Sequence, residues 1–246
     1  MKFDGIVIGG GAAGMMSAIT AARSGSRVLL LERNGRLGKK LLITGKGRCN
    51  VTNDCSAQEV LQNVPRNGRF LYSAMTAFPP ERAKAFFEEN GCPLKTERGN
   101  RVFPQSDKAQ SVLTSLERSM REAGVEIRGE RAVHILTREN RVSGVQTENG
   151  FFAAKWVILA TGGVSYPATG STGDGYAMAK ELGHTVVEPV GNLVPLEIAG
   201  DDCPDMQGLS LRNVGVKLLN DKGKILYQDF GELLFTHFGV SGPTVL

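Results

Sequence analysis

Six consecutive residues near the start of the chain form its clearest chemical pattern. They read Gly-Gly-Gly-Ala-Ala-Gly and place glycines at Gly9, Gly11 and Gly14, in the spacing G-x-G-x-x-G. The first glycine of this pattern permits a tight turn, the second lets backbone approach a pyrophosphate, and the third lets a helix pack on a strand. The N–H groups of Ala12 and Ala13 would open that helix and face the phosphates. The pattern predicts a dinucleotide site.

An acidic residue stands where such a site needs one. Glu32 lies eighteen residues after Gly14 and closes a run of apolar residues. A carboxylate at this position accepts hydrogen bonds from both ribose hydroxyls and repels a 2′-phosphate. The dinucleotide is therefore expected to be FAD or NAD, and not NADP.

A basic stretch follows directly. Residues 33–53 contain six Lys and Arg residues and no acidic one. The stretch lacks the spacing of a Walker loop, and residues 35–53 lack the aromatic side chains that accompany cations in segments that bind RNA. Cys49 and Cys55 are six residues apart, so Cys49 is expected to be a packed thiol and not half of a redox disulfide.

The remaining interpretation is a cradle for phosphate and flavin, with a solvated loop as its alternative. Backbone N–H groups of residues 44–50 would lie along the cofactor, and a positive charge near the ring would stabilise reduced, anionic flavin. The residues assigned to this cradle are Arg33, Lys39, Lys40, Thr44, Gly45, Gly47, Arg48, Cys49 and Asn50.

A second glycine-rich turn ends a buried-looking strand at residues 156–161. Its residues are Ala160, Thr161, Gly162 and Gly163. A simple turn is the alternative, but flavoproteins with two dinucleotide-binding domains carry such a turn under the cofactor. We therefore assign these four residues to the site and expect Val133, at the start of the preceding β-meander, near the adenine.

Hydrophobic periodicity predicts the elements that position these groups. Residues 3–8, 13–24 and 27–31 are expected to form a strand, a helix and a strand. A long excursion over residues 33–106 follows, and a helix at 107–123 then leads to a third parallel strand at 125–128. Within the excursion we expect helices at residues 56–64, 69–78 and 81–90, the first with a capping box formed by Ser56 and Glu59.

After about residue 190 the sequence pattern changes and indicates β-strands. Residues 132–161 read as the β-meander, and residues 213–228 read as a hairpin that turns at 221–223. The predicted fold is α/β: a Rossmann-like FAD-binding domain at residues 1–190, with a parallel sheet and the meander. Residues 191–246 are expected to begin an inserted, β-containing domain on the substrate side.

Composition excludes several classes of protein. With 41% hydrophobic and 22% charged residues the chain is expected to be a soluble globular protein, and a net charge of +4 gives little reason to expect a nucleic-acid partner. Residues 5–22 are uncharged, but five glycines interrupt them, so no membrane helix is expected. The four cysteines have no CxxC spacing and predict neither a metal site nor disulfides, which favours a cytoplasmic setting.

The three histidines are far apart in the sequence. His134, His184 and His237 therefore predict no metal site. Only His237 lies in a glycine-rich, partly apolar loop, and it is the one candidate for a general acid. The catalytic residues are otherwise unassigned.

Five segments together resemble the BaiN-like or YhiN-like flavoproteins, which are bacterial FAD-binding oxidoreductases that include a bile-acid enone reductase and aminoacetone oxidases. The segments read IGGGAAGMMSAITAA, GKKLLITGKGRCNVTN, RVFPQSDKAQSVL, ATGGVSYPATGSTGDGYAMAKELGH and GELLFTHFGVSGP. Members of the family are longer than this chain and complete the flavin site with a later glycine-rich segment. The resemblance therefore implies a C-terminally truncated member in which FAD affinity and turnover are reduced.

The resemblance implies an FAD-dependent oxidoreductase. Electrons would pass from NAD(P)H through bound flavin to a small organic acceptor with an activated C=C bond. One alternative is an amine-type oxidase that passes electrons to O2, and another is a flavin-binding RNA-modification or regulatory protein. The sequence carries a single dinucleotide fingerprint, so it indicates no separate nicotinamide site, and it leaves the oligomeric state unassigned.

Overall fold

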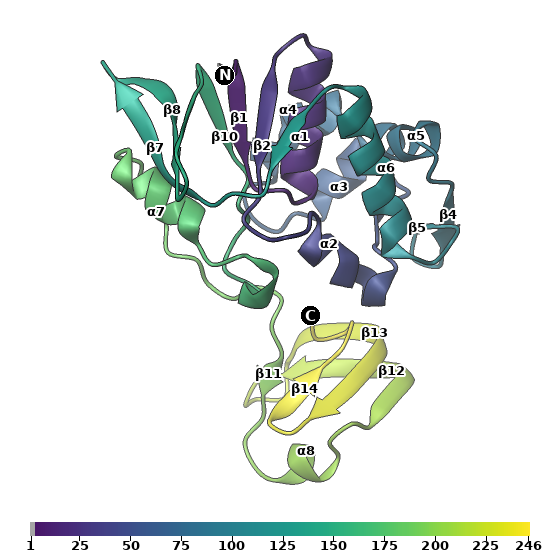
Figure 1. Ribbon diagram of the computed structural model, residues 1–246. Helices are drawn as coiled ribbons and strands as arrows, with labels where there is room; N and C mark the ends of the chain where they lie inside the picture. Colours follow the sequence, from purple (N-terminus) through teal and green to yellow (C-terminus); the bar gives the residue numbers. More distant parts are fainter. Residues whose placement is uncertain (1–2) are drawn as a thin grey trace. The chain divides into compact units, whose positions relative to one another are not determined.

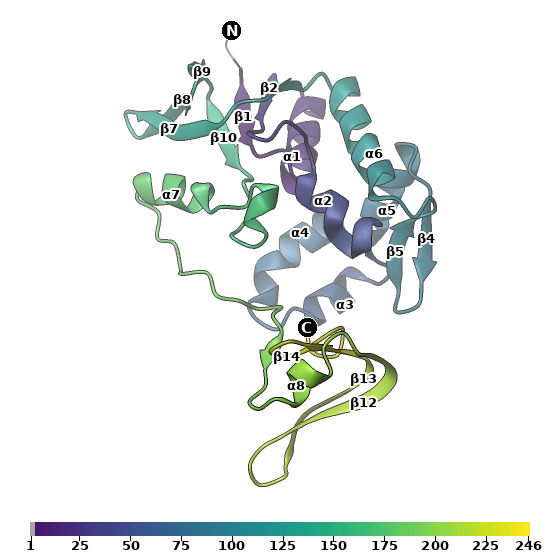
Figure 2. The same cartoon turned by 60° about the horizontal axis from the view of Figure 1, so that its bottom comes forward.

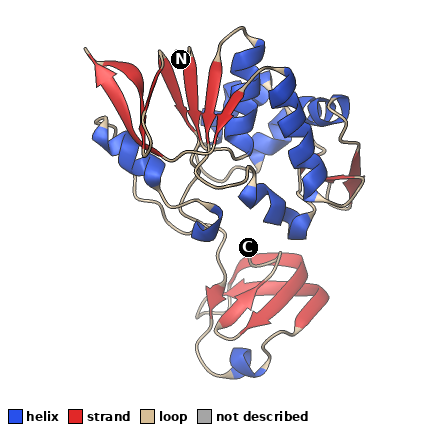
Figure 3. Cartoon of the chain, viewed as in Figure 1, coloured by secondary structure: helices blue, strands red, loops and turns tan. Residues whose placement is uncertain are grey.

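The computed structural model describes residues 3–246, which form two compact units, one ending at Val186 and one beginning at Val187. The boundary expected from the sequence, between residues 190 and 191, lies close to this division. The first unit contains both helices and strands, whereas the regular elements of the second are strands and one short helix (Figure 3). Within residues 3–246 no helix is both long and apolar enough to span a bilayer.

A four-stranded parallel sheet forms the centre of the first unit. Its order is β10 (Trp156–Leu159), β1 (Gly5–Ile8), β2 (Val28–Leu31) and β6 (Glu126–Arg128). Every residue of β1 and β2 is buried, as expected for parallel strands covered on both faces. The predicted βαβ unit, the third parallel strand and the α/β fold class are thus confirmed.

Different elements cover the two faces of this sheet (Figure 1). On one face Val7 and Leu30 pack against α1 (Ala12–Arg23) and α6 (Ala109–Glu122). On the other, Ile6 and Leu29 pack in a cluster with residues of the antiparallel meander and of α7 (Asp174–Glu181). The meander is confirmed over residues 132–153, with strands β7 (Ala132–Arg138), β8 (Arg141–Thr147) and β9 (Phe151–Ala153). The strand expected to end it, β10, instead joins the parallel sheet at its edge and is only partly buried.

The excursion between β2 and α6 contains short helices and a small sheet. Its elements are α2 (Lys39–Ile43), η1 (Thr44–Gly47), β3 (Thr52–Asn53), α3 (Ala57–Gln62), η2 (Gly68–Leu71), α4 (Tyr72–Ala77), α5 (Pro80–Glu89), β4 (Leu94–Glu97) and β5 (Arg101–Pro104). The capping box of α3 is present as predicted. Figure 2 shows α2, α3, α4 and α5 most clearly.

Two parts of the excursion differ from expectation. Residues 39–43, expected to be loop, form helix α2, which starts after Gly38 at a φ of +63° and buries Leu41 in the core. Residues 94–104, to which the sequence analysis assigned no element, form the antiparallel hairpin β4–β5. Both segments are stabilised by a side chain buried in the core, Leu41 in the first and Val102 in the second. Each segment is too short for its pattern of apolar residues to predict a helix or a strand.

The second unit is an antiparallel sheet of order β11 (Leu196–Glu197), β14 (Gly239–Ser241), β13 (Ile225–Thr236) and β12 (Ser210–Leu219), with one short helix, α8 (Asp202–Asp205). The predicted hairpin is confirmed as β12–β13. Its turn is closed by Asn220, whose Oδ1 accepts the N–H groups of Lys222 and Lys224, and by Gly223 at a φ of +76°.

Candidate dinucleotide site

The structure around the turn between β1 and α1 explains the glycines at positions 9, 11 and 14. Gly9 has a φ of +109°, and a Cβ on it would lie 2.4 Å from the carbonyl oxygen of Ala160. A Cβ on Gly14 would lie 1.8 Å from the carbonyl oxygen of Gly9, so the helix could not pack at this distance. At Gly11, in contrast, a Cβ would meet no atom within 4 Å. Gly11 therefore faces open space.

The start of α1 has free donors at this open space. Gly11 is the N-cap residue and no side chain caps the helix. The first N–H groups of a helix have no partner within it, and the helix dipole places partial positive charge there. The site can therefore accept an anionic group next to Gly11.

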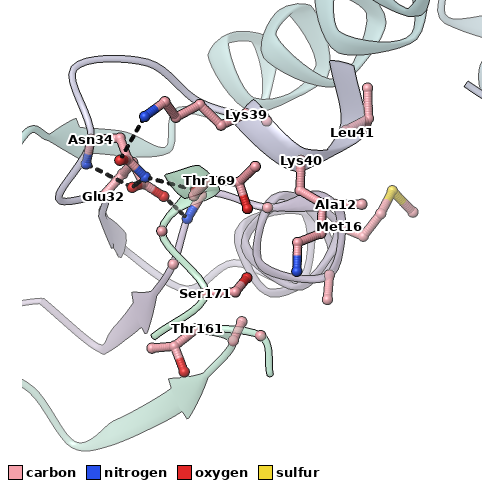
Figure 4. A pocket seen from close by; sticks show the side chains of 18 of the residues that line it. Ala12, Met16, Glu32, Asn34, Lys39, Lys40, Leu41, Thr161, Thr169 and Ser171 are labelled. Atoms are coloured by element: carbon pink, nitrogen blue, oxygen red, sulfur yellow. Dashed lines mark hydrogen bonds between the residues drawn. The ribbon is translucent and has the colours of Figure 1, made fainter. Parts of the chain in front are cut away.

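A cavity of about 600 Å³ lies over this turn (Figure 4). It is lined by the glycine turn, the end of β2, residues of α2 to Asn50, and the segment from the end of β10 to α7. Of the residues assigned from the sequence, those that line it are Gly9, Gly11, Ala12, Ala13, Glu32, Arg33, Lys39, Lys40, Thr44, Cys49, Asn50, Ala160, Thr161 and Gly162.

Glu32 is held in a fixed orientation at the end of β2. Its Oε2 accepts the N–H of Gly10 at 2.7 Å. Its Oε1 accepts the backbone N–H of Asn34 at 2.8 Å and the side-chain amide of Asn34 at 2.7 Å. Each carboxylate oxygen can accept more than one hydrogen bond, so Glu32 keeps capacity for a ligand hydroxyl. Asn34 was not assigned from the sequence, although its position two residues after Glu32 could have indicated it.

The cations of the basic stretch connect two distant segments. Lys39 Nζ donates to the carbonyl of Ala168 at 3.1 Å, and Lys40 Nζ donates to the carbonyl of Ser165 at 2.7 Å. Arg33 pairs with Asp174 at 2.7 Å and donates to the carbonyl of Gly170. These partners of both lysines are carbonyl oxygens and not carboxylates, so these bonds form no ion pair.

The segment they hold was missed by the sequence analysis. Thr169, Gly170 and Ser171 line the cavity, next to the short helix η3 (Pro167–Thr169). Gly170 has a φ of +103°, and a Cβ there would lie 2.6 Å from the side-chain amide of Asn34. The repeated glycines of this segment could have indicated from the sequence that it belongs to the site.

The other assigned residues do not line the cavity. Gly14 packs under the turn, Gly45 and Gly47 lie in η1, Val133 lies in β7 beside the cavity-lining Ala132, and Gly163 lies beyond Gly162. His237 belongs to the second unit, between β13 and β14, with its ring centroid 4.8 Å from that of Phe238. Within residues 3–246 no cluster of His, Cys, Asp and Glu could hold a metal ion.

Arg48, which was predicted to lie near the cofactor, does not line the cavity and instead pairs with acidic side chains. Its Nη1 lies 2.9 Å from Glu97 and 3.2 Å from Asp107, and its guanidinium carbon lies 4.0 Å from the centroid of Phe103. The bond from Arg48 lowers the pKa of Glu97, and bonds from Lys95 and then Arg48 lower the pKa of Asp107. Arg48 thus ties the glycine loop to the β4–β5 hairpin.

Replacing Arg48 with methionine is expected to reduce the sensitivity of the fold to acid. A carboxyl group with a lowered pKa in the folded protein stabilises it above the group's ordinary pKa, and this contribution is lost as the pH falls through the folded-state value. Thermal unfolding followed from about pH 5 to about pH 3 should therefore show a smaller fall in Tm for Arg48→Met than for the parent.

Arg118→Met is the control, since it removes an Arg–Glu pair within α6. An equal acid-induced fall in Tm for the parent and Arg48→Met would show that the cluster around Arg48 contributes nothing to stability.

The cysteines differ in burial and hence in reactivity. Burial raises the pKa of the Cys49 thiol, and burial raises that of Cys92 to about 11. Both side chains are buried, whereas Cys55 is partly exposed. Because the thiolate is the reactive form, Cys49 should behave as a packed thiol even though it lines the cavity.

We expect iodoacetamide at pH 8 to label Cys55 well before Cys49 or Cys92. Peptide mass spectrometry over a time course measures this order, and labelling in denaturant shows that all four thiols can react. Labelling of Cys49 as fast as that of Cys55 would identify Cys49 as a reactive thiol of the site.

Comparisons with known proteins agree with this geometry. The profile of the family described as HI0933-like protein Rossmann domain matches residues 3–242. The chain is 35% identical to the 3-dehydro-bile acid delta(4,6)-reductase of Clostridium scindens over 241 residues, 97% of this chain and 58% of the reductase. It is 29% identical to the ribosomal RNA dihydrouridine synthase of Escherichia coli over 245 residues, 100% of this chain and 60% of the synthase.

Solved structures share the fold. The chain superposes with a TM-score of 0.56 and 19% identity on a flavocytochrome c3 fumarate reductase, covering 86% of this chain and 47% of that one. For the 3-ketosteroid-delta4-(5alpha)-dehydrogenase of Rhodococcus jostii the TM-score is 0.57 at 18% identity, covering 74% and 54%. The chain spans about three fifths of the curated relatives named above. It belongs to the HI0933-like Rossmann-domain family, in agreement with the resemblance to the BaiN-like or YhiN-like flavoproteins.

Proposed function

We propose that this chain binds FAD in the cavity over the glycine turn and serves a reductase that acts on C=C bonds conjugated to a carbonyl group. The observation that carries the proposal is the pairing of two features at one cavity. Gly11 leaves open space at an uncapped helix start, and Glu32 is held beside it with its carboxylate oriented by Gly10 and Asn34.

Each part of the cavity suits a part of FAD. The N–H groups of Ala12 and Ala13 would bind the pyrophosphate, with the charges of Lys39 and Lys40 nearby. Glu32 would accept a ribose hydroxyl. Thr44, Asn50, Thr161 and Gly162 also line the cavity and would contact the flavin part. When bound, the flavin supplies the hydride transfer, and the chain's own residues position and shield it.

The names of two relatives describe the same type of bond. A delta(4,6)-reductase of a 3-dehydro bile acid reduces a C=C bond conjugated to the 3-oxo group. A dihydrouridine synthase saturates the uracil C5=C6 bond, which is conjugated to the C4 carbonyl. Because one chemistry covers both names, we infer that the acceptor of this protein is an activated C=C bond. The first candidate acceptor is a small molecule, and the proposed electron donor is NAD(P)H.

Adding FAD to the purified chain and recording its visible spectrum tests cofactor binding. Anaerobic titration with NADH and with NADPH then tests the donor, and a steroid enone tests the acceptor. Bleaching by NAD(P)H followed by enone-dependent reoxidation is the expected result. Rapid reoxidation by O2 with release of peroxide would favour the oxidase alternative, and failure to take up FAD would overturn the proposal.

A uridine in RNA is the second candidate acceptor. The observation that favours it is the 29–30% identity, over nearly the whole chain, to ribosomal RNA dihydrouridine synthases from Escherichia coli and Haemophilus influenzae. No nucleic-acid partner is expected from the sequence, because residues 35–53 of the basic stretch contain no aromatic residue. Loss of a uracil absorbance at 260 nm on reduction would distinguish this acceptor from an enone.

A further inference from the structure

The cavity over the glycine turn continues into a part with a different chemical lining. Two of its lining residues lie four positions apart on α5 and two more lie four positions apart on α6, and this spacing places each pair on one face of its helix. Helices α1 and α2 each contribute one further apolar side chain. We call this part the apolar lobe, and its residues are Met16, Leu41, Ala83, Phe87, Val112 and Leu116.

The apolar lobe has a buried base and a partly exposed edge. Leu41, Val112 and Leu116 are between 0% and 8% exposed and belong to one core cluster. Met16 and Phe87 are only partly buried, and both pack against the same cluster. Apolar side chains from four helices thus meet at one part of the cavity. A concave, mostly apolar lining of this kind is typical of sites that bind small molecules.

Helix α2 directs its charged and its apolar side chains to different parts of the cavity. Lys39 and Lys40 donate hydrogen bonds to carbonyl groups of the segment that leads to α7, whereas Leu41 is buried in the core. In Figure 4 the side chain of Lys39 points toward Asn34, and Met16 and Leu41 lie on the other side of the view. The positive charges of α2 are therefore directed away from the apolar lobe.

The apolar lobe adjoins the residues that would contact the flavin. Cys49 and Val51, the two neighbours of Asn50, also line the cavity and pack in or against the same core cluster. Thr44 Oγ1 donates to the carbonyl of Leu41 at 2.7 Å. Burial raises the pKa of the Cys49 thiol, so this group is uncharged at neutral pH. A molecule in the apolar lobe would therefore lie next to the flavin part of the cavity without meeting a charge from this thiol.

We propose that the apolar lobe binds the carbon skeleton of the electron acceptor, and that this acceptor is an uncharged, apolar enone. Removal of apolar surface from water is the interaction that this lining offers. A charged group would lose its hydration there without gaining a partner. A nucleotide in RNA carries a charged phosphate and a polar ribose, so the lining favours an enone over a uridine. The proposal rests on the proposed function, in which the chain binds FAD and the acceptor is an activated C=C bond.

The test is isothermal titration calorimetry of the full chain with carvone, a monocyclic, uncharged enone, in the presence and in the absence of FAD. The parent should bind carvone under both conditions and should not bind uridine. Ala83→Trp places a large ring in the apolar lobe and should bind carvone about tenfold more weakly or worse. Its Kd for FAD, measured by quenching of flavin fluorescence, should equal that of the parent.

The matched control is Ala85→Trp on the same helix. Ala85 is partly buried like Ala83 but does not line the cavity, and two positions along an α-helix correspond to about 200° around its axis. The affinity of Ala85→Trp for carvone should equal that of the parent. Phe78→Ala is a second variant that disturbs no core packing, because Phe78 lines the cavity and is 41% exposed. It should also bind carvone more weakly than the parent.

Three results would overturn the apolar lobe as the acceptor site. They are a parent that takes up FAD but does not bind carvone, carvone binding that FAD abolishes, and equal affinity for carvone in the parent, Ala83→Trp and Phe78→Ala. Uridine binding as tight as that of carvone would overturn the choice of an apolar acceptor. Carvone binding that is weakened by Ala83→Trp, in a parent that takes up no FAD, would support the lobe as an apolar site and overturn the proposed function.

Discussion

Replacing Gly11 with valine is expected to abolish stable FAD binding while leaving the fold intact. Gly11 has a φ of −79° and a ψ of −178°, which any residue can adopt. Its missing Cβ points into open space, so the added methyl groups would meet no protein atom at the Cβ position. They would occupy the place where backbone must approach a pyrophosphate. Flavin absorbance retained after desalting, together with Tm, measures both expectations.

Gly14→Ala is the matched comparison, and we expect the opposite result. A Cβ at Gly14 would lie 1.8 Å from the carbonyl oxygen of Gly9, so α1 must move away from β1. Overpacking of this kind costs about 3 kcal/mol, which lowers Tm by roughly 6–12 °C in a chain of this size. Normal FAD retention by Gly11→Val, or a fold as stable as the parent's in Gly14→Ala, would show that the two glycines have been assigned the wrong roles.

Those parts of the fold that depend on local pattern could be predicted from the sequence. In residues 3–24 the strand, the glycine turn and the helix each have a recognisable pattern of apolar residues and glycines within a short stretch of sequence. The capping box of Ser56 and Glu59 likewise spans only four positions. Helix α2 and the β4–β5 hairpin could not be predicted, because each is short and is stabilised by burial of Leu41 or Val102 against distant elements.

The hydrogen-bond partners of the Lys and Arg side chains in the basic stretch could not be predicted either, because they lie far away in the sequence. Lys40 and Ser165 are 125 residues apart in the chain, and Arg33 and Asp174 are 141 apart. Sequence spacing carries no information on such pairs. The sequence therefore predicted that the Lys and Arg side chains of the basic stretch are all available to bind phosphate. In the structure these charges also hold the segment around Gly170 against the end of β2.

Glu32→Ala is expected to weaken FAD binding about tenfold or more. Gly10 and Asn34 fill three of the roughly four acceptor positions of the carboxylate, so one ribose hydroxyl would lose its partner. A hydrogen bond to a charged group is worth about 1.5–3 kcal/mol, which corresponds to at least tenfold in Kd. The substitution also leaves the N–H groups of Gly10 and Asn34 without the carboxylate that accepts them at 2.7–2.8 Å. Quenching of flavin fluorescence during titration of the chain into FAD measures the Kd.

Two further variants separate the ligand contact from the orientation of the carboxylate. Glu32→Gln keeps one acceptor oxygen without the charge, and its NH2 group would face the N–H of Gly10 or of Asn34, which it cannot accept. Its affinity should fall by less than that of Glu32→Ala, since a neutral acceptor remains but makes a weaker bond than a charged one. Asn34→Ala keeps the carboxylate and removes a side-chain donor that orients it, so its affinity should lie between those of Glu32→Gln and the parent. If Asn34→Ala were as damaging as Glu32→Ala while Glu32→Gln bound FAD normally, the carboxylate would serve to hold the turn together, and the ribose would have to be bound elsewhere.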